Sequence, residues 1–274
     1  MSSQPTRRRF LQLAGSVTLV TLGGPVFAAP APGSISMLEA INQAGRQRML
    51  SQRMAKLYGQ QLRNVRNTDA GKLMATSIAL FDQQLTTLRA FAQKQGATEV
   101  AKSYDELGVR WNDYRTVVSA QPTSEGLRQV AQLNELVLTN AHQATLMLEK
   151  LHGGSLGKLV NISGRQRMLS QRMSKFYFFR SNGLNSAEVG KGLETARGEF
   201  LAALNTLKNA PENSNEIRNW IELAEAQWPF FDDAVRAQTA DRGEQAYHDS
   251  NVATTSENIL QVMDKLTGLY AALS

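Results

Sequence analysis

Cysteine is absent from the 274-residue sequence, which excludes disulfide bonds, thiol nucleophiles and thiolate metal sites. Histidine is scarce, because only His142, His152 and His248 occur and none has a second ligand at the spacing of a zinc or haem site. Glycine-rich nucleotide-binding motifs and the nucleophile elbow of serine hydrolases are also missing. We therefore expect a protein that is not an enzyme and that holds no cofactor and no metal.

Long apolar runs are missing as well, and no stretch approaches the roughly 20 apolar residues that span a bilayer. The N-terminus has a basic segment, a short apolar stretch interrupted at residues 23–25, and small residues before Ala28. This order predicts a signal peptide over residues 1–28, removed near Ala28, followed by a linker over residues 29–33. Residues 7–11 (RRRFL) resemble a twin-arginine export signal, with an ordinary secretory signal as the alternative. We expect a periplasmic protein.

The net positive charge of the chain is small once the predicted signal peptide is removed. The chain has 30 basic and 24 acidic side chains, and the signal contributes the three arginines at positions 7–9. An excess of about three positive charges is low for a protein that binds polyanions. We therefore expect no nucleic acid as a partner.

The decapeptide GRQRMLSQRM occurs twice, at residues 45–54 and 164–173. The same offset aligns further identical residues, namely Asn42 with Asn161, Lys56 with Lys175, Tyr58 with Tyr177 and Phe81 with Phe200. Later in the sequence Trp111 aligns with Trp228, and residues 137–153 align with 252–268. This pattern predicts a tandem duplication, with one copy at 34–153 and the other at 154–274.

Each copy has apolar residues at every third or fourth position, which predicts helices and no strands. We expect helices at 35–66, 70–95, 98–119, 124–152, 155–182, 187–209, 213–238 and 242–272. Short connections favour antiparallel packing. The predicted fold is therefore all-α, either two tandem antiparallel four-helix bundles or one merged eight-helix bundle with pseudo-twofold symmetry. Pro229 lies inside a predicted helix, and we expect a kink there.

The repeated decapeptide places its three arginines on two sides of a helix. Arg46 and Arg53 fall on one side and are expected to be solvated or to form interhelical salt bridges. Arg48 falls on a stripe of apolar and small residues, where a charge needs a partner. A guanidinium matches the geometry of nitrate or a carboxylate, and neighbouring serine and glutamine side chains add donors. The predicted ligand-binding residues are Arg48, Ser51 and Gln52, with Arg167, Ser170 and Gln171 in the second copy.

A structural role is the alternative for Arg48 and its equivalent. A buried arginine can pair with an acid on a neighbouring helix, and the candidates in this sequence are Asp82, Glu135 and Glu149.

Residues 41–58 (INQAGRQRMLSQRMAKLY) and 160–179 (VNISGRQRMLSQRMSKFYFF) resemble a known sensor region. It is shared by type IV pilus methyl-accepting chemotaxis transducers (PilJ-like) and nitrate/nitrite sensor kinases (NarX-like). The resemblance covers the mature chain as two copies. It implies a periplasmic four-helix bundle that reports ligand occupancy to a membrane-attached signalling module. It also aligns Arg48 and Arg167 with the anion-binding arginine of the nitrate sensors.

The resemblance leads to a functional hypothesis. The chain is expected to be an exported sensory protein that binds a small anion, such as nitrate, nitrite or a carboxylate. It would then signal to a membrane-bound sensor kinase or chemoreceptor. Two copies in one chain can replace the two subunits of a sensor dimer, with Arg48 and Arg167 converging on one anion; stacking of the bundles end to end is the alternative. The chain would be a pseudo-symmetric monomer or a homodimer.

A second functional hypothesis needs no ligand. In this alternative, the chain is a structural protein that docks a chemoreceptor or a pilus-related helical bundle. The two hypotheses differ in whether small oxyanions bind to the chain.

Overall fold

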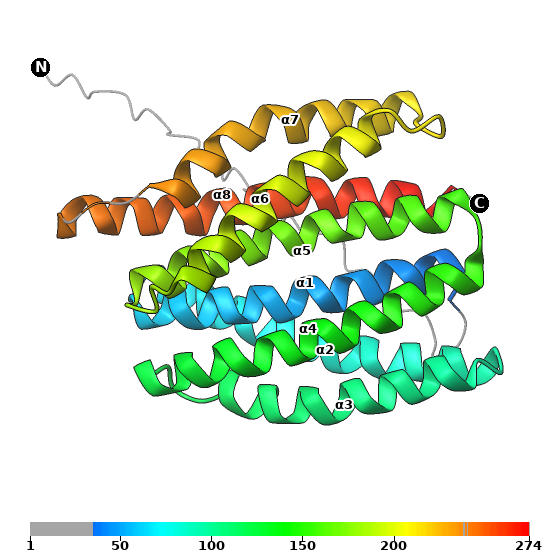
Figure 1. The fold of residues 1–274 in the computed structure, drawn as a ribbon, viewed down its shortest axis with the longest axis horizontal. Coiled ribbons are helices and arrows are strands. Elements are labelled where there is room, and N and C mark those ends of the chain that lie inside the picture. The colour runs from blue at the N-terminus through cyan, green and yellow to red at the C-terminus, as the bar shows by residue number, and fades with distance from the viewer. Residues whose placement is uncertain (1–34, 238, 240, 274) are drawn as a thin grey trace, which may run out of the picture. The chain divides into compact units, whose positions relative to one another are not determined.

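The computed structural model describes residues 35–237, 239 and 241–273, and within them all regular secondary structure is helical. The prediction of an all-α fold is therefore confirmed, and each predicted helix range overlaps one observed helix (Figure 1). The predicted signal peptide and linker lie outside the described residues. The helices are α1 Met37–Leu62, α2 Asn67–Lys94, α3 Thr98–Val118, α4 Ser124–His152, α5 Ser155–Ser181, α6 Ala187–Lys208, α7 Asn215–Arg236 and α8 Arg242–Ala271.

Local sequence explains where the helices begin and end. Thr123 caps α4, because its side chain accepts a hydrogen bond from the backbone N–H of Gly126. Gly153 ends the same helix with a φ of 69°, a left-handed conformation that favours glycine, so α4 and α5 are separate helices. Pro229 lies inside α7, which continues through it.

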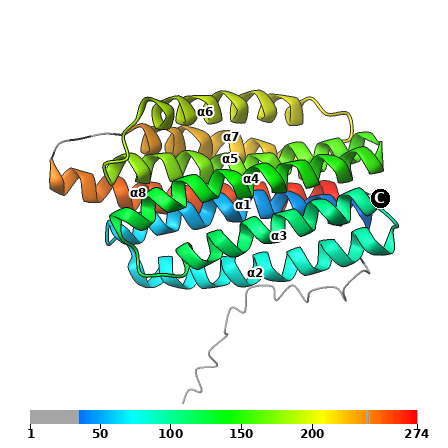
Figure 2. The same ribbon diagram turned by 60° about the horizontal axis from the view of Figure 1, so that its bottom comes forward.

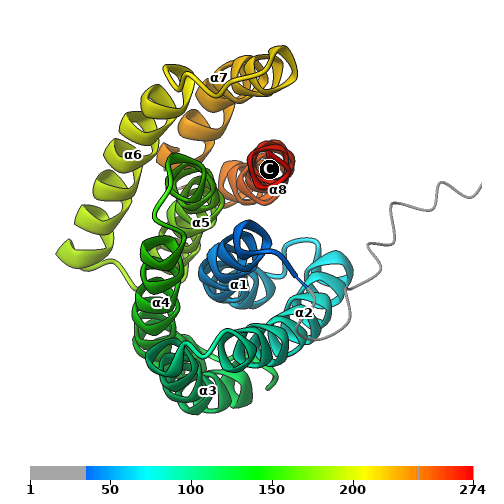
Figure 3. The same cartoon turned by 90° about the vertical axis from the view of Figure 1, so that its right-hand side faces the viewer.

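The two helices that carry the repeated decapeptide, α1 and α5, pack against each other along the middle of the bundle (Figure 3). Helix α4 packs on α1, and α8 packs on α5. Helices α2 and α3 flank the α1 side, and α6 and α7 flank the α5 side, all lengthwise (Figure 2). The motif helices therefore face each other, as the dimer-like hypothesis expects, and are not stacked end to end.

Both halves contain the same aromatic cluster. In each half a phenylalanine ring stacks on a tryptophan, with ring centroids 4.0 Å apart in the first half and 4.6 Å apart in the second. Another aromatic ring meets each tryptophan edge-on, with centroids 6.1 Å apart. The clusters are Phe81, Trp111 and Tyr114, and Phe200, Trp228 and Phe231. The two tryptophans therefore occupy equivalent places between the outer helices, although the buried Trp111 also donates to Asp82 Oδ1 at 2.7 Å.

Helices α4 and α8 are the last helices of the two halves. Their residues correspond in the structure with a different register from the one in the sequence alignment. That alignment paired Glu149 with Asp264. In the structure, His142 is the α4 residue that contacts Arg48, and Asp264 is the α8 residue that contacts Arg167. The structural equivalent of Asp264 is therefore His142, about two helical turns before Glu149. Sequence similarity between two amphipathic helices does not distinguish such shifts, because apolar positions recur every seven residues.

Candidate functional site

Two glycines set the distance between the motif helices. A Cβ atom added to Gly45 would lie 3.7 Å from the Cα of Gly164, which belongs to the facing helix. The same Cβ would lie 3.2 Å from Nη2 of Arg48 and 3.4 Å from Nη2 of Arg167. The absence of a side chain therefore lets α1 and α5 approach closely and brings the two predicted arginines together at the crossing.

Arg48 is fully buried and is held by uncharged groups. Its Nη2 donates to Oδ1 of Asn161 at 2.6 Å, and its Nη1 lies 3.1 Å from Nδ1 of His142. No carboxylate forms an ion pair with Arg48 among the described residues; Glu149 accepts a hydrogen bond from the Asn161 amide and acts on Arg48 through its charge alone. The Nε–H of Arg48 has no partner among the described residues.

Arg167 is equally buried but is held by a carboxylate. Its Nη1 donates to Oδ1 of Asp264 at 2.6 Å, and its Nη2 donates to the carbonyl oxygen of Asn42 at 3.0 Å. Arg46 donates to the same carboxylate. Burial by itself would raise the pKa of Asp264, but the charges of Arg167 and Arg46 outweigh burial and lower this pKa to about 2. The two identical motif arginines therefore differ in how their charge is balanced.

The acids proposed as structural partners for Arg48 have other hydrogen-bond donors. Asp82 accepts from Trp111, and Glu135 accepts from Arg172 at 2.9 Å. Arg46 forms an interhelical salt bridge with Asp264, and Arg53 forms one with Glu257. The sequence had left open whether these two arginines are solvated or form such salt bridges. Pairing with an acid on a neighbouring helix, the structural role considered for these arginines, therefore applies to Arg167. Its partner, Asp264, was not among the acids that the sequence had indicated.

Electrostatics make the Arg48 end of the crossing unfavourable in this state. Burial, followed by the nearby charges of Arg165 and Arg167, lowers the pKa of Arg48 to about 9. At neutral pH the guanidinium nevertheless stays charged. A buried charge that lacks a direct counter-charge is costly. An anion placed here would therefore be stabilised by Arg48 more strongly than by an exposed arginine.

His142 is uncharged at neutral pH, because burial and then the charge of Arg48 lower its pKa to about 4. A guanidinium N–H can only donate, so Nδ1 of His142 accepts and the ring proton is on Nε2. His142 thus occupies a donor of Arg48 without neutralising it.

A cavity of about 550 Å³ lies between α4, α5 and α6, with Arg48 and His142 in its wall. Its cationic lining residues are Arg48, Arg165, Arg172 and Lys191, and its acids are Glu188 and Glu199. Arg165 pairs with Glu199 at 2.7 Å, and Arg172 pairs with Glu135. Among the lining residues, all within the described part of the chain, two cations (Arg48 and Lys191) and one acid (Glu188) have no direct ion pair, which leaves an excess of one positive charge. The cavity is therefore suited to a negatively charged guest.

The serine and glutamine residues predicted as ligands are buried and bonded within the bundle. Ser51 and Ser170 each donate at 2.8 Å to the carbonyl oxygen of the motif arginine one turn before. Gln52 donates to Asn134, and Gln171 donates to the carbonyl oxygen of Ser256. None of the four predicted residues lines the cavity. The glutamine contacts fix α1 against α4 and α5 against α8, whereas the serine contacts stay within their own helices. A direct role of these residues in ligand binding stays a prediction.

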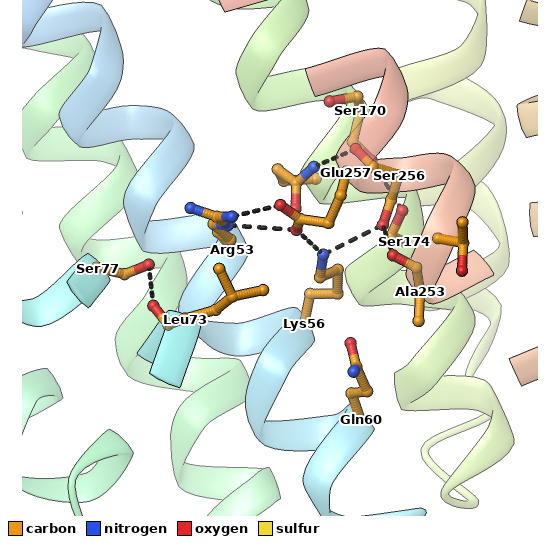
Figure 4. A network of polar contacts seen from close by, with 12 residues as sticks. Arg53, Lys56, Gln60, Leu73, Ser77, Ser170, Ser174, Ala253, Ser256 and Glu257 are labelled. Carbon is orange, nitrogen blue, oxygen red and sulfur yellow. Dashed lines mark hydrogen bonds and ion pairs between the residues drawn. The ribbon is translucent and has the colours of Figure 1, made fainter. Parts of the chain in front are cut away.

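Two buried lysines form a polar layer that the sequence had not indicated. Lys56 donates to Oε1 of Glu257 at 2.5 Å and to Ser256 at 3.1 Å, and Figure 4 shows it reaching from α1 between these residues of α8. Arg53 also pairs with Glu257. The equivalent Lys175 donates to Glu135 Oε1 at 2.6 Å. The sequence did contain a signal for this layer, because Lys56 and Lys175 are identical residues at the offset of the repeat.

The buried Lys175 gives a prediction for the pH dependence of stability. Burial and then the charge of Arg172 lower the pKa of Lys175 to about 7, against the opposing effect of Glu135. Because the unfolded lysine has a pKa of about 10.4, the unfolded chain binds more protons between these two values. The free energy of unfolding is therefore expected to rise from pH 7 to pH 9. Urea unfolding at a series of pH values measures this.

The matched variants for this prediction are Lys175→Met and Lys208→Met. Lys208 is an exposed lysine that pairs with Glu225, so its removal should leave the rise unchanged. The rise should become smaller in Lys175→Met. An identical pH profile in wild type and Lys175→Met would contradict the assignment.

Comparison with known proteins identifies part of the chain. Residues 35–136 match the family described as type IV pili methyl-accepting chemotaxis transducer N-term (PilJ). This match covers the first decapeptide and the helices from α1 into α4, so the predicted PilJ-like sensory domain is confirmed there. The searches of curated proteins and of solved structures gave no match. None of the helices in the described ranges combines the length and apolar character needed to cross a bilayer.

Proposed function

We propose that this chain, which carries a PilJ-like sensory domain, is an exported periplasmic protein that binds one small anion at Arg48 and signals to a membrane chemoreceptor or sensor kinase. The observation that carries the proposal is the difference between the two motif arginines. Arg167 has a carboxylate at 2.6 Å, whereas Arg48 has only a neutral histidine and an amide. An anion at Arg48 would supply the charge that Asp264 supplies at Arg167.

The chemistry of the site supports nitrate, nitrite or a carboxylate as ligand. A guanidinium offers two parallel donors to a planar oxyanion, and such charge-assisted bonds are strong in a site from which water is excluded. Arg167 contributes through its charge, because it lies beside Arg48 at the Gly45 crossing. Nothing in this arrangement resembles a nucleophile with its base, so we propose a binding protein and not an enzyme.

Signalling would use the position of Arg48 between the two halves. Its side chain links α1 to Asn161 of α5 and to His142 of α4. If an anion binds more tightly to an arrangement in which these contacts have changed, it shifts the conformational equilibrium towards that arrangement. Export by the twin-arginine route, with removal of the signal near Ala28, is part of the same proposal.

A thermal-shift screen with nitrate, nitrite and acetate tests the proposal. At a concentration of 100 times its dissociation constant, a ligand stabilises the folded state by about 2.7 kcal/mol. We expect at least one of these anions to raise the melting temperature of the wild type by about 5 °C or more. Arg48→Met should lose this shift, while Arg167→Met should keep most of it because Asp264 still has Arg46 as its partner.

The docking alternative has its own supporting observation. Helix α4 exposes several large apolar side chains to solvent, namely Leu136, Leu146, Met147 and Leu151. Such residues are common in surfaces that bind another helix. If no anion shifts the melting temperature, the docking function is favoured over anion binding.

A further inference from the structure

We propose that the cavity between α4, α5 and α6 binds an organic carboxylate, whose carboxylate group replaces His142 on Arg48. This inference rests on the proposed function, because it names the ligand class for the same arginine. It goes further by placing the body of the ligand in a cavity whose α4 and α6 walls lie outside the repeated decapeptides. It also assigns to His142 the role of a displaceable partner.

The choice of a carboxylate follows from a comparison within the chain. Nη1 of Arg167 meets Oδ1 of Asp264 on α8, and Nη1 of Arg48 meets Nδ1 of His142 on α4. The two guanidinium groups are otherwise held alike, because Nη2 of each donates to the residue six positions before the other motif arginine. The chain thus contains a carboxylate bound to one arginine and a neutral group at the same position on the other. A carboxylate ligand on Nη1 of Arg48 would make the surroundings of the two arginines equivalent.

The cavity is lined from both halves of the chain, by α1 and α4 of the first and by α5 and α6 of the second. Its α6 wall contains Gly192 and Ala196, and at the repeat offset α2 has Leu73 and Ser77 instead. In α6, the position equivalent to Leu73 has no side chain. The space at Gly192 is taken up by the ring of Phe176 on α5, whose Cζ would lie 2.5 Å from a Cβ atom added there, and the cavity lies beside this contact.

The size of the cavity favours an organic ligand over an inorganic ion. Its volume is about 550 Å³. A water molecule occupies about 30 Å³ of liquid, and sites for organic ligands range from about 300 to 1,000 Å³. Nitrate alone would leave most of this space to water. Leu138, Met168 and Ala196 provide apolar contacts for a hydrocarbon body.

His142 has the properties of a displaceable partner. Its ring is part of the cavity wall and is only half-buried, whereas Arg48 behind it has no exposed surface. A ligand in the cavity therefore reaches the guanidinium only when the imidazole moves. A charged carboxylate forms a stronger bond to the guanidinium than a neutral imidazole nitrogen does. The energy that is lost from the His142 contact is thus more than replaced.

Calorimetric titration of the chain with nitrate, acetate, butyrate and hexanoate tests the inference. Affinity should rise at least tenfold from acetate to hexanoate, because each added CH₂ group leaves water for the cavity wall. Thr195 is an exposed residue of the α6 wall, so Thr195→Leu should fill space and weaken hexanoate binding about tenfold or more. The matched control is Thr76→Leu, the equivalent position on α2, which should change nothing.

Nuclear magnetic resonance of the His142 ring gives an independent readout. Saturating hexanoate should shift its signals and raise its pKa from about 4 towards the ordinary value, because the ring loses Arg48 and gains a carboxylate neighbour. The inference is overturned if nitrate binds but affinity does not rise along the carboxylate series, or if the His142 signals stay unchanged. If neither nitrate nor any carboxylate binds, the proposed function fails as well.

Discussion

Replacing Glu257 by alanine is expected to destabilise the folded state by about 3 to 5 kcal/mol. This carboxylate pairs with Lys56, whose side chain has no exposed surface, and with Arg53. Its removal leaves two cations close together inside the bundle, one of them fully buried. The cost of an unpaired buried charge is far larger than the benefit of an exposed ion pair. Urea unfolding followed by circular dichroism measures the difference.

Glu225 provides the control for this prediction. It pairs with Lys208 at 2.8 Å on the surface, so Glu225→Ala should change stability by about 0.5 kcal/mol or less. Lys56→Met should cost less than Glu257→Ala, because Glu257 keeps Arg53 as its partner. A loss in Glu257→Ala as small as that in Glu225→Ala would show that the Lys56 layer is not a buried ion pair.

Acid pH tests the same layer without a mutation. Burial alone would raise the pKa of Glu257, but the charges of Lys56 and Arg53 lower it to about 2. A carboxylate with a lowered pKa contributes stability that is complete above its unfolded pKa and lost as pH falls through the folded value. The contribution of Glu257 should therefore decline between about pH 4.5 and pH 2.

Gly45→Leu should destabilise the chain by about 1 to 2 kcal/mol and should separate the two motif arginines. A Cβ atom at this position already approaches Arg48 Nη2 at 3.2 Å and the Gly164 backbone at 3.7 Å. The remaining leucine atoms have no space, and overpacking of a well-packed interface typically costs about 1 to 3 kcal/mol. This cost exceeds the gain of about 1 kcal/mol from the higher helix propensity of leucine.

Gly198→Leu is the matched control, because a Cβ atom on that glycine of α6 meets nothing within 4 Å. This variant should be as stable as the wild type or slightly more stable. Anion binding should be lost in Gly45→Leu and kept in Gly198→Leu. If Gly45→Leu is as stable as Gly198→Leu, the close crossing of α1 and α5 is wrong.

The sequence predicted the helices and the position of Arg48 because both depend on local patterns. Apolar residues at helical spacing indicate the helix, and the same spacing places Arg48 on its buried side. The packing of α1 on α5 was one of two arrangements left open. The glycine pair Gly45 and Gly164 was visible in the repeated decapeptide, but its meaning depends on which helix lies opposite.

The partners of the arginines could not be predicted in the same way. Asp264 lies 97 positions after Arg167, and Glu257 lies 201 positions after Lys56. Such contacts depend on how far one helix is shifted along another, which amphipathic patterns determine only to within a heptad. The cavity depends on how α6 lies against α4 and α5, and the packing of the Phe176 ring on Gly192 becomes visible only when α6 is placed against α5.

Of the two identical motif arginines, we propose that only Arg48 is available to an anion. The most direct measurement is the stoichiometry of oxyanion binding by calorimetry in wild type, Arg48→Met and Arg167→Met. The structure predicts one site per chain, which is lost in Arg48→Met and kept in Arg167→Met. Two sites per chain, or unchanged binding in Arg48→Met, would contradict it.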